Sequence, residues 1–362
     1  MATTATSAYG PSRMTDSTGS VSALRKTVFV LVLLAVPIFF VLELTIGTTV
    51  IPLVDVLRAL SGGETSRESW RDIVLVLRLP RAITAMVASA ALAAGGLLMQ
   101  TVFRNPLAGP WVLGITAGAR LGVATILFLN GLVMTGSDLG MLDAVANTSL
   151  AFGACAGATA VLLIMAAVAR RVNAITLLIV GLMIQYLAPS LDGILAHLTP
   201  EDQRETWKMW YFAAYDNTTW DQLAIMIPVI AVCVGIALLL TKSLNAFLLG
   251  EQYARSIGAN VSRTRTASLA CMLGLSGIVT AYCGPVSFLD LAVPHLCRGL
   301  LKTSDHRLLL PAVLATGAAI GLAADFFVHL PWEKHVFHLD YLMALIGAPV
   351  ILWVVLKGRH IQ

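Results

Sequence analysis

The stretch that decides how this chain is organised is TKSLNAFLLGEQYARSIGANVSRTR, residues 241–265, which separates two long apolar runs. The chain is 57% hydrophobic, so a polar and basic stretch of this length must lie outside the lipid. Its middle predicts a short helix over Glu251–Ile257, with Glu251 in the first turn and Gly258 placed to end the helix in a left-handed turn. Such a helix either rests on the bilayer surface or is presented to a soluble partner.

Composition indicates a multispan helical membrane protein. Charged residues are only 12% of the 362 residues, and the mean hydropathy is +0.82. The apolar runs are too long and too uniformly apolar for barrel strands, so the expected fold class is all-α and polytopic. About ten transmembrane helices are expected, at residues 27–47, 81–102, 113–131, 145–169, 175–196, 222–240, 266–283, 288–300, 308–328 and 341–356.

The first 24 residues are rich in Ser, Thr and Gly. We therefore expect a disordered N-terminal segment over 1–24 and a transmembrane domain over 25–362. The first apolar run lacks a small-residue cleavage site, which favours an uncleaved helix over a signal peptide. With both termini in the cytoplasm, two thirds of the Lys and Arg residues fall on the inside, as the positive-inside rule favours. The five cysteines lie in apolar segments without metal-type spacing and are expected to be core residues.

Five arginines depart from this rule, because they fall on the outer side between the first two spans: Arg58, Arg67, Arg71, Arg78 and Arg81. Local pairing with the acids of the same segment, namely Asp55, Glu64, Glu68 and Asp72, explains the first three. Arg78 and Arg81 flank Leu79-Pro80 at the start of the second span, away from those acids. The orientation rule disfavours positive charge there, so another partner is expected for these two residues.

Two apolar segments are interrupted by glycine and proline. FRNPLAGP, residues 103–110, joins the second and third spans, and CGPVSFLDLAVPH, residues 283–295, joins the seventh and eighth. Proline forbids a continuous helix, and the Asn105 side chain can hydrogen-bond the freed backbone. Such breaks in two halves predict an internal inverted repeat with a pathway between the halves, although they also occur as simple span ends. The short eighth span is expected to be a partial helix packed inside protein.

Other polar residues point to no chemistry. The segment from His197 to Trp220 carries acidic and aromatic residues, which is typical of an interfacial belt, with direct substrate contact as the alternative. Asp192, Asp290 and Asp325 lie within spans but form no evident proton relay. No GxxxxGK[ST], HExxH or GxSxG motif occurs, so the sequence indicates no ATP site, no catalytic residues and no metal site.

The motif Leu-Gly-Glu-x-x-Ala-Arg-x-x-Gly at 249–258 resembles the coupling helix in permease subunits of ABC importers for iron-siderophores, haem and vitamin B12. Similar family motifs stand, in the family's order, within residues 78–118, 283–298, 304–311 and 345–357. The resemblance implies a coupling helix over about 248–258. Its ATPase-contacting residues would be Leu249, Gly250, Glu251, Ala254, Arg255 and Gly258.

The resemblance also implies two further sites. The RLPR arginines, here Arg78 and Arg81, would face the periplasm and pair with glutamates of a substrate-binding protein. His329 stands where the family has a third docking arginine, so this contact would be weaker or sensitive to pH. An inner gate would lie at Asn105 and Leu107 and at Ala174 and Ile175.

The function implied by the resemblance is that of the membrane-spanning subunit of an ATP-driven importer in the bacterial inner membrane. A second permease subunit, identical or different, two ATPase subunits using ATP and Mg²⁺, and a periplasmic binding protein would be its partners. Lipid surrounds it, while nucleic acid and a cofactor of its own are not expected. The cargo would be an iron-siderophore, haem or cobalamin, and His329, His335 and His338 near the outer face are compatible with haem.

Two other classes compete with this interpretation. A secondary transporter driven by a proton or sodium gradient would need an intramembrane carboxylate, and few are present. A membrane scaffold without transport activity would leave the two broken segments unexplained.

Overall fold

The structure is a computed structural model that describes residues 16–133, 142–169, 171–172, 174–201, 212, 214–216, 218–330 and 337–358. Within these ranges every regular element is helical. The elements are α1 (Asp16–Thr45), α2 (Leu53–Leu60), α3 (Glu68–Asp72), the π-helical turns of η1 (Ile73–Arg78), α4 (Leu79–Val102), α5 (Ile115–Val133), α6 (Leu142–Ala169), α7 (Ala174–Leu198), α9 (Trp220–Leu239), α10 (Thr241–Leu248), α11 (Glu251–Ser256), α12 (Val261–Cys283), α13 (Leu289–Leu301), α14 (His306–Val328) and α15 (Leu339–Gly358).

The long helices coincide with the predicted spans. In chain order, α1, α4, α5, α6, α7, α9, α12, α13, α14 and α15 overlap the ten predicted ranges, so the all-α polytopic class is confirmed. Seven of the described helical segments are long and apolar enough to cross a membrane, and α5 and α15 contain shorter apolar stretches. α1 already begins at Asp16, inside the segment expected to be disordered, while residues 1–15 lie outside the described ranges.

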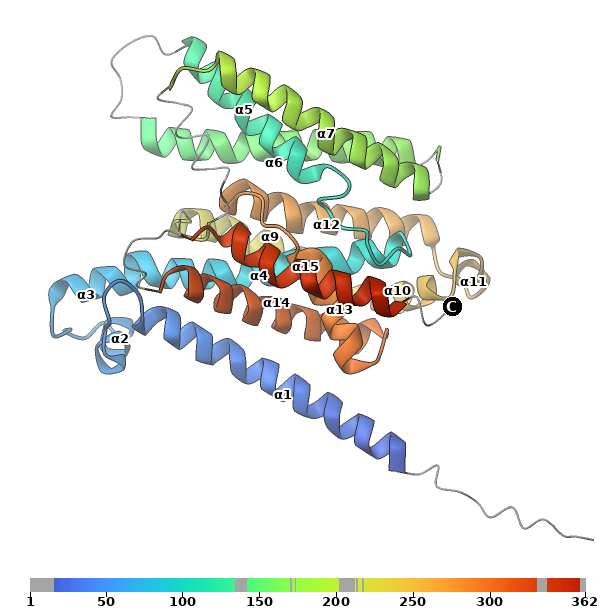
Figure 1. The fold of residues 1–362 in the computed structure, drawn as a ribbon, viewed down its shortest axis with the longest axis horizontal. Helices are drawn as coiled ribbons and strands as arrows, with labels where there is room; N and C mark the ends of the chain where they lie inside the picture. Colours follow the sequence, from blue (N-terminus) through green and yellow to red (C-terminus); the bar gives the residue numbers. More distant parts are fainter. Residues whose placement is uncertain are drawn as a thin grey trace, which may run out of the picture.

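α4 lies at the centre of the bundle, where it packs against α9, α12, α13 and α14 (Figure 1). Small residues make this contact possible, since the run Ala91–Thr101 is buried throughout. A Cβ atom at Gly96 would lie only 1.8 Å from the carbonyl oxygen of Asp290 in α13. The glycine and alanine residues of this span therefore allow the close approach of its neighbouring helices.

α5, α6 and α7 pack against one another along one edge of the molecule (Figure 1). α5 and α6 touch through glycines: a Cβ atom at Gly122 would lie 2.0 Å from the carbonyl oxygen of Gly153. The same distance separates a Cβ atom at Gly157 from the carbonyl oxygen of Gly118. α12 contacts both α6 and α4 and so joins this group to the rest of the bundle.

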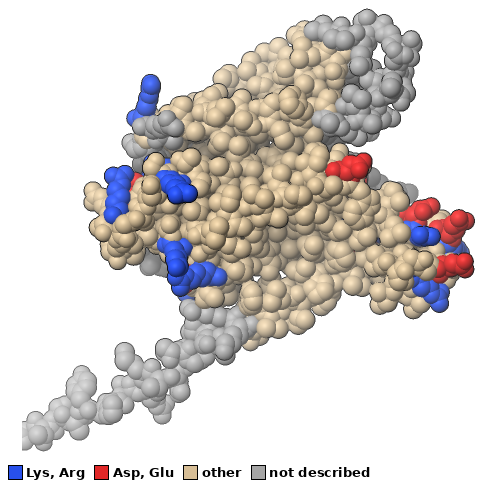
Figure 2. Space-filling view, turned by 180° about the vertical axis from the view of Figure 1, so that it is seen from behind, with Lys and Arg blue, Asp and Glu red and all other residues tan. Residues whose placement is uncertain are grey.

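The two ends of the bundle differ in charge. Figure 2 shows a belt free of charged side chains between an end where Lys and Arg gather and an end where Asp and Glu lie with Lys and Arg. The basic end is the end of α10 and α11, and the mixed end is that of α2 and α3 (Figures 1 and 2). The start of α1 and the end of α15 both lie at the α11 end (Figure 1), so the described chain begins and ends on the same side.

The segment from α2 to η1 pairs its charges only partly as predicted. Arg58 lies 3.5 Å from Asp55, which confirms that pair. Backbone and side-chain hydrogen bonds from Ser66 to Asp55 lower the pKa of this carboxyl below its usual value. Arg67 has no ion pair with an acid among the residues that the structure describes. It lies over the Trp70 ring, 5.2 Å from its centroid, because the indole face attracts a guanidinium.

The predicted aromatic belt is described only in part, since Trp207 and Trp210 lie outside the described residues. Trp220 is exposed at the start of α9, and its Nε1 donates a hydrogen bond to the Leu75 carbonyl at 3.0 Å. Tyr215, expected on the outer face, is instead fully buried, with its hydroxyl 2.8 Å from Ser89 Oγ in α4. A buried partner for the hydroxyl allows the ring to be part of the core.

Candidate functional site

α11 is a short helix bounded by glycines. It follows Gly250, whose φ of 108° only glycine adopts readily, and Gly258 has a φ of 84° just beyond its last residues. The predicted helix and its left-handed ending at Gly258 are therefore confirmed. The chain changes direction at both glycines, so α11 can lie across the end of the bundle and does not continue α10 or α12.

Exposed apolar side chains form a ridge at α11, made of Leu249, Tyr253 and Ile257. Their exposure ranges from 49% to 65%. Tyr253 and Ile257 are four residues apart and lie on one side of the helix, whereas Leu249 comes before the turn at Gly250 that starts α11. Arg255, two residues after Tyr253 and four after Glu251, lies on the side of Glu251 and is also exposed. Ala254, predicted to belong to the contact surface, is fully buried, because it packs on Phe247 and Val261. In this conformation Ala254 supports the ridge and is not part of its surface.

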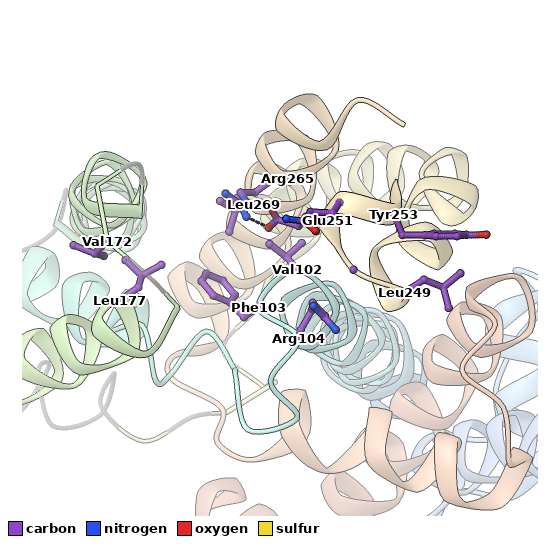
Figure 3. Close-up of a pocket in the computed structure, with 12 residues that line it drawn as sticks. Val102, Phe103, Arg104, Val172, Leu177, Leu249, Glu251, Tyr253, Arg265 and Leu269 are labelled. Atoms are coloured by element: carbon purple, nitrogen blue, oxygen red, sulfur yellow. Dashed lines mark hydrogen bonds and ion pairs between the residues drawn. The ribbon is translucent and has the colours of Figure 1, made fainter. Parts of the chain in front are cut away.

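Glu251 is turned toward the bundle. Its carboxylate pairs with the Arg265 guanidinium of α12 and lies 3.9 Å from Arg255 (Figure 3). The first turn of α11 is therefore tied to the first turns of α12. Glu251 retains about one third exposure, so the carboxylate remains within reach of a partner.

Beside α11 lies a cleft of about 750 Å³ (Figure 3). Three parts of the chain meet there: the end of α4, the start of α7 with the residues before it, and α11 with α12. Arg104 on the floor of the cleft has a φ of 47°, and its guanidinium lies close to Gly250. The lining residues are Val102, Phe103, Arg104, Val172, Leu177, Leu249, Gly250, Glu251, Gln252, Tyr253, Arg265 and Leu269.

The predicted gate residues lie next to this cleft. Asn105 Oδ1 accepts a hydrogen bond from the Leu107 amide at 2.9 Å, and the Leu107 side chain is exposed. The predicted role of Asn105 for the broken backbone is thereby confirmed. Ala174 and Ile175 form the start of α7, but their side chains lie outside the described part of the chain. The gate itself stays a prediction.

The two broken segments meet inside the protein. α13 begins after Phe288, which has a φ of 64°, and a Cβ atom at Gly109 would lie 2.7 Å from Asp290 Oδ2. His295 Nε2 lies 2.7 Å from the Pro106 carbonyl oxygen. With 13 residues, most of them buried, α13 is the partial helix expected from the sequence. The inverted repeat stays a prediction.

At the opposite end, Arg78 and Arg81 are bound within the chain. Arg78 is 4% exposed, and its guanidinium donates hydrogen bonds to the carbonyls of Leu44, at 2.9 Å, and Thr49. Arg81 pairs with Glu43 of α1 at 2.6 Å and with Asp325 of α14 at 3.2 Å. The expectation that Arg78 lies at the surface is therefore wrong, since the chain just after α1 covers this residue. Docking through these residues stays a prediction.

His329 extends this charged cluster. Its Nδ1 lies 3.3 Å from Asp325 and its Nε2 lies 3.8 Å from Asp216. Burial lowers the pKa of His329, but hydrogen bonds with Asp216 and Asp325 outweigh it and raise the pKa to about 10. A contact that titrates near pH 6.5 is therefore not expected. Sequence reasoning missed Glu43, although an ionisable residue inside an apolar span is a signal in itself.

Among the described residues, neither the possible metal ligands nor the histidines considered for haem form a ligand-binding site. Donor atoms of Glu43, Asp325 and His329 lie within 4.8 Å of one another, but the Arg81 guanidinium already supplies the cation between the two carboxylates. His338 stacks on Phe212 with ring centroids 4.0 Å apart, and His335 lies outside the described residues.

These features define the class of the protein: a polytopic helical membrane transport protein with broken inner segments and a short helix presented beyond the lipid. The sequence matches the FecCD transport family over residues 33–357, and the chain belongs to that family. It is accordingly a permease subunit of an ABC importer, and ATP hydrolysis lies in partner subunits.

Relatives and a solved structure agree with this assignment. The chain is 33% identical to the ferric enterobactin transport system permease protein FepD of Escherichia coli K12 over 342 residues, which cover 93% of this chain and 97% of that protein. It is 31% identical to the hemin transport system permease protein HmuU of Yersinia pestis (84% and 88%) and 30% identical to the vitamin B12 import system permease protein BtuC of Klebsiella pneumoniae (86% and 93%). An inward-facing ABC transporter of the metal-chelate type shares the fold, with a TM-score of 0.74 and 23% identity over 92% of this chain and 99% of that chain.

Proposed function

We propose that this chain carries a metal chelate, namely a ferric siderophore, haem or cobalamin, across the bacterial inner membrane, with its basic end and both termini in the cytoplasm. Relatives named for three cargoes match it at 30–33% identity, so identity alone does not choose among them. The observation that carries the coupling part of the proposal is the exposed ridge of Leu249, Tyr253 and Ile257 at the α11 end of the bundle (Figure 1). Apolar side chains at such a position gain free energy by docking on a soluble protein.

The proposed coupling step follows from the construction of α11. An ATPase subunit that binds the ridge and Arg255 would displace α11 together with the adjoining ends of α10 and α12, because Ala254 packs on Phe247 and Val261. The Glu251–Arg265 pair would carry that displacement into α12. In this proposal the ATPase subunits bind ATP and Mg²⁺. A second permease subunit, identical or different, completes the pathway. The contact with the ATPase is formed or supported by Leu249, Gly250, Glu251, Arg255 and Gly258.

The same proposal places a periplasmic binding protein at the end of α2 and α3. Arg81 keeps 13% of its side chain exposed and His329 keeps 25%, so these two cations are accessible to acidic residues of a partner. Arg78 contributes through the backbone of the segment it holds. Docking should weaken as salt rises, since rim charges act mainly on the encounter rate.

A reconstituted system tests the coupling proposal. The chain is placed in proteoliposomes with its cognate ATPase and binding protein, and cargo uptake is measured against ATP hydrolysis. Tyr253→Ser and Leu249→Ser should abolish ATPase binding and uptake while the chain still folds. Leu57→Ser is the matched control for ATPase binding, which it should leave unchanged, because Leu57 is also an exposed leucine, 56% accessible, but lies in α2 at the other end. Normal uptake in the ridge variants would overturn the proposal.

An ion-driven secondary transporter is the competing function. It would need a carboxylate free to exchange a cation, yet Asp192 pairs with Arg120 at 3.1 Å and Asp325 pairs with Arg81. Pairing of this kind favours fixed charges over a relay. Uptake that continues without ATP and stops when the proton and sodium gradients are collapsed would support the alternative.

A further inference from the structure

A buried hydrogen-bonded chain connects the segment that carries α11 to the end of α4. We propose that His306, the first residue of α14, is a positioning residue that transmits displacement of α10 and α11 to α4. The inference rests on the proposed ATPase contact at α11 and names a residue beyond that contact.

The ring of His306 is bonded on both sides. The residue has no exposed surface, and its Nδ1 lies 2.8 Å from Oδ1 of Asn245 in α10. On the other side, Nε2 lies 2.8 Å from the Oγ1 atom of Thr101, one residue before the end of α4. The ring therefore bridges α10 and α4 directly.

The neighbouring bonds fix the direction of each hydrogen bond. Asn245 Nδ2 donates to the Asp305 carboxylate at 2.6 Å, so Asn245 Oδ1 faces His306 and also accepts from its backbone amide at 2.9 Å. An amide oxygen only accepts, so the pattern assigns the ring hydrogen to Nδ1. A neutral ring with that hydrogen accepts at Nε2, so the single hydrogen of the Thr101 hydroxyl is shared between Nε2 and the Leu97 carbonyl oxygen, which lies 2.8 Å away in the preceding turn of α4.

Packing makes α10 and α11 move together. Phe247 of α10, Ala254 of α11 and Val261 at the start of α12 form one buried apolar cluster. A displacement of α11 therefore reaches Asn245 through α10, and the Asn245–His306–Thr101 bonds pass it to α4. Buried hydrogen bonds suit this role, because they are directional and strong at low dielectric, whereas apolar contacts can slide.

The end of α4 in turn controls the broken segments. Gln100, next to Thr101, accepts from the Arg298 guanidinium of α13 and donates to the Leu291 carbonyl at 3.4 Å. The chain then leaves α4 and enters the loop with Asn105 and Leu107, the proposed inner gate. A displacement of Thr101 would thus also move the proposed gate and the partial helix α13.

The test removes the hydroxyl of Thr101 without changing the shape of the side chain. Thr101→Val in the complete reconstituted importer should lower the cargo moved per ATP hydrolysed about fivefold or more, because the bond to His306 is lost and Nε2 is left unpaired. The hydroxyl's second bond, to the Leu97 carbonyl of the preceding turn, is lost as well. Complex assembly and basal ATP hydrolysis should stay at wild-type levels. Thr84→Val is the matched control in the same helix, since the Thr84 hydroxyl is also buried but bonds the Pro80 carbonyl of α4.

Two substitutions of the ring separate its two bonds. His306→Asn retains a donor near the Nδ1 position toward Asn245, whereas His306→Gln retains a polar group near the Nε2 position toward Thr101. Adding Thr101→Val to His306→Asn should cause no further loss of cargo moved per ATP, whereas adding it to His306→Gln should cause a further loss. A residue with a purely structural role would not produce this difference between the two double variants. If Thr101→Val fails to assemble, His306→Asn is the variant whose cargo per ATP decides the question.

A wild-type ratio of cargo to ATP in Thr101→Val or in His306→Asn would overturn the inference while leaving the proposed function intact. Failure of the proposed function would look different, because the unmodified chain would then take up cargo without any dependence on the ATPase.

Discussion

The Arg81 guanidinium of α4 lies 2.6 Å from the Glu43 carboxylate of α1, and the same guanidinium lies 3.2 Å from Asp325 of α14. One side chain thus joins three helices at the end opposite α11. Both carboxylates are almost completely removed from solvent, so Arg81 and not water compensates their charge. The first span is thereby bound to the core by charge as well as by apolar packing.

Loss of this guanidinium should be costly. Arg81→Met leaves Glu43 without its cation and Asp325 with His329 alone, and we expect the free energy of unfolding to fall by about 3–5 kcal/mol. Adding Glu43→Gln should recover part of that loss, because one buried charge is removed. Denaturant unfolding in detergent measures both effects. Arg71→Met, in the exposed α3, serves as the control and should change little, and an equal loss there would contradict the prediction.

His329 should stabilise the fold in a pH-dependent way. Its pKa of about 10 in the folded protein lies above the unfolded value of 6.5, so its contribution is complete below pH 6.5 and is lost as the pH rises toward 10. His329→Gln removes this contribution. The difference in melting temperature between wild type and variant should therefore shrink between pH 6.5 and 10. A difference that is constant over this range, or one that grows, would argue against the Asp216 and Asp325 contacts.

Substitutions in the Glu251–Arg265 pair test whether Glu251 ties α11 to α12 or contacts the ATPase itself. Glu251→Arg alone adds a third cation beside Arg255 and Arg265 and should reduce coupling, with less than about 1 kcal/mol lost in stability because these side chains are partly exposed. Glu251→Arg combined with Arg265→Glu restores an ion pair in the reverse direction. Transport should recover in the double variant if the carboxylate serves to tie α11 to α12. No recovery would mean that the ATPase contacts Glu251 itself.

The α5–α6 contact should tolerate no side chain at Gly157. A valine there would place its Cβ about 2.0 Å from the Gly118 carbonyl oxygen, so the helices would have to separate. Gly157→Val should lower both the yield of folded protein and its melting temperature. Gly193→Val in α7 is the control, because a Cβ atom there meets nothing within 4 Å. Similar behaviour of the two variants would contradict the packing.

Local signals in the sequence were sufficient for the ten spans and for α11, but did not predict α2, α3, η1 or α10. Apolar length predicted the order of the ten helices, and glycine at 258 predicted the end of α11, because both depend on the chain's own backbone and its transfer to lipid. The partial helix α13 followed from the prolines and glycine around it. These are interactions within a few turns of chain, and they do not require knowledge of the partner helices.

The partners of polar residues could not be predicted in this way. Asn245 and His306 are separated by 61 residues, and Glu43 and Arg81 by 38, so their pairing depends on how the helices pack. For the same reason the sequence placed Tyr215 on the surface and Ala254 in a contact face. A side chain's exposure is decided by which neighbour covers it, and spacing within one helix does not contain that information.

The sequence by itself thus determined the class of protein, the order of its spans and the position of the short helix beyond the lipid, since hydrophobic length and glycine or proline positions act locally. Only the tertiary structure decided that Arg78 is covered, that Arg81 is bound by two buried carboxylates, and that His306 bridges α10 to α4. The physical reason is that a buried charge or hydrogen-bonding group must find a partner in space, wherever in the chain that partner lies.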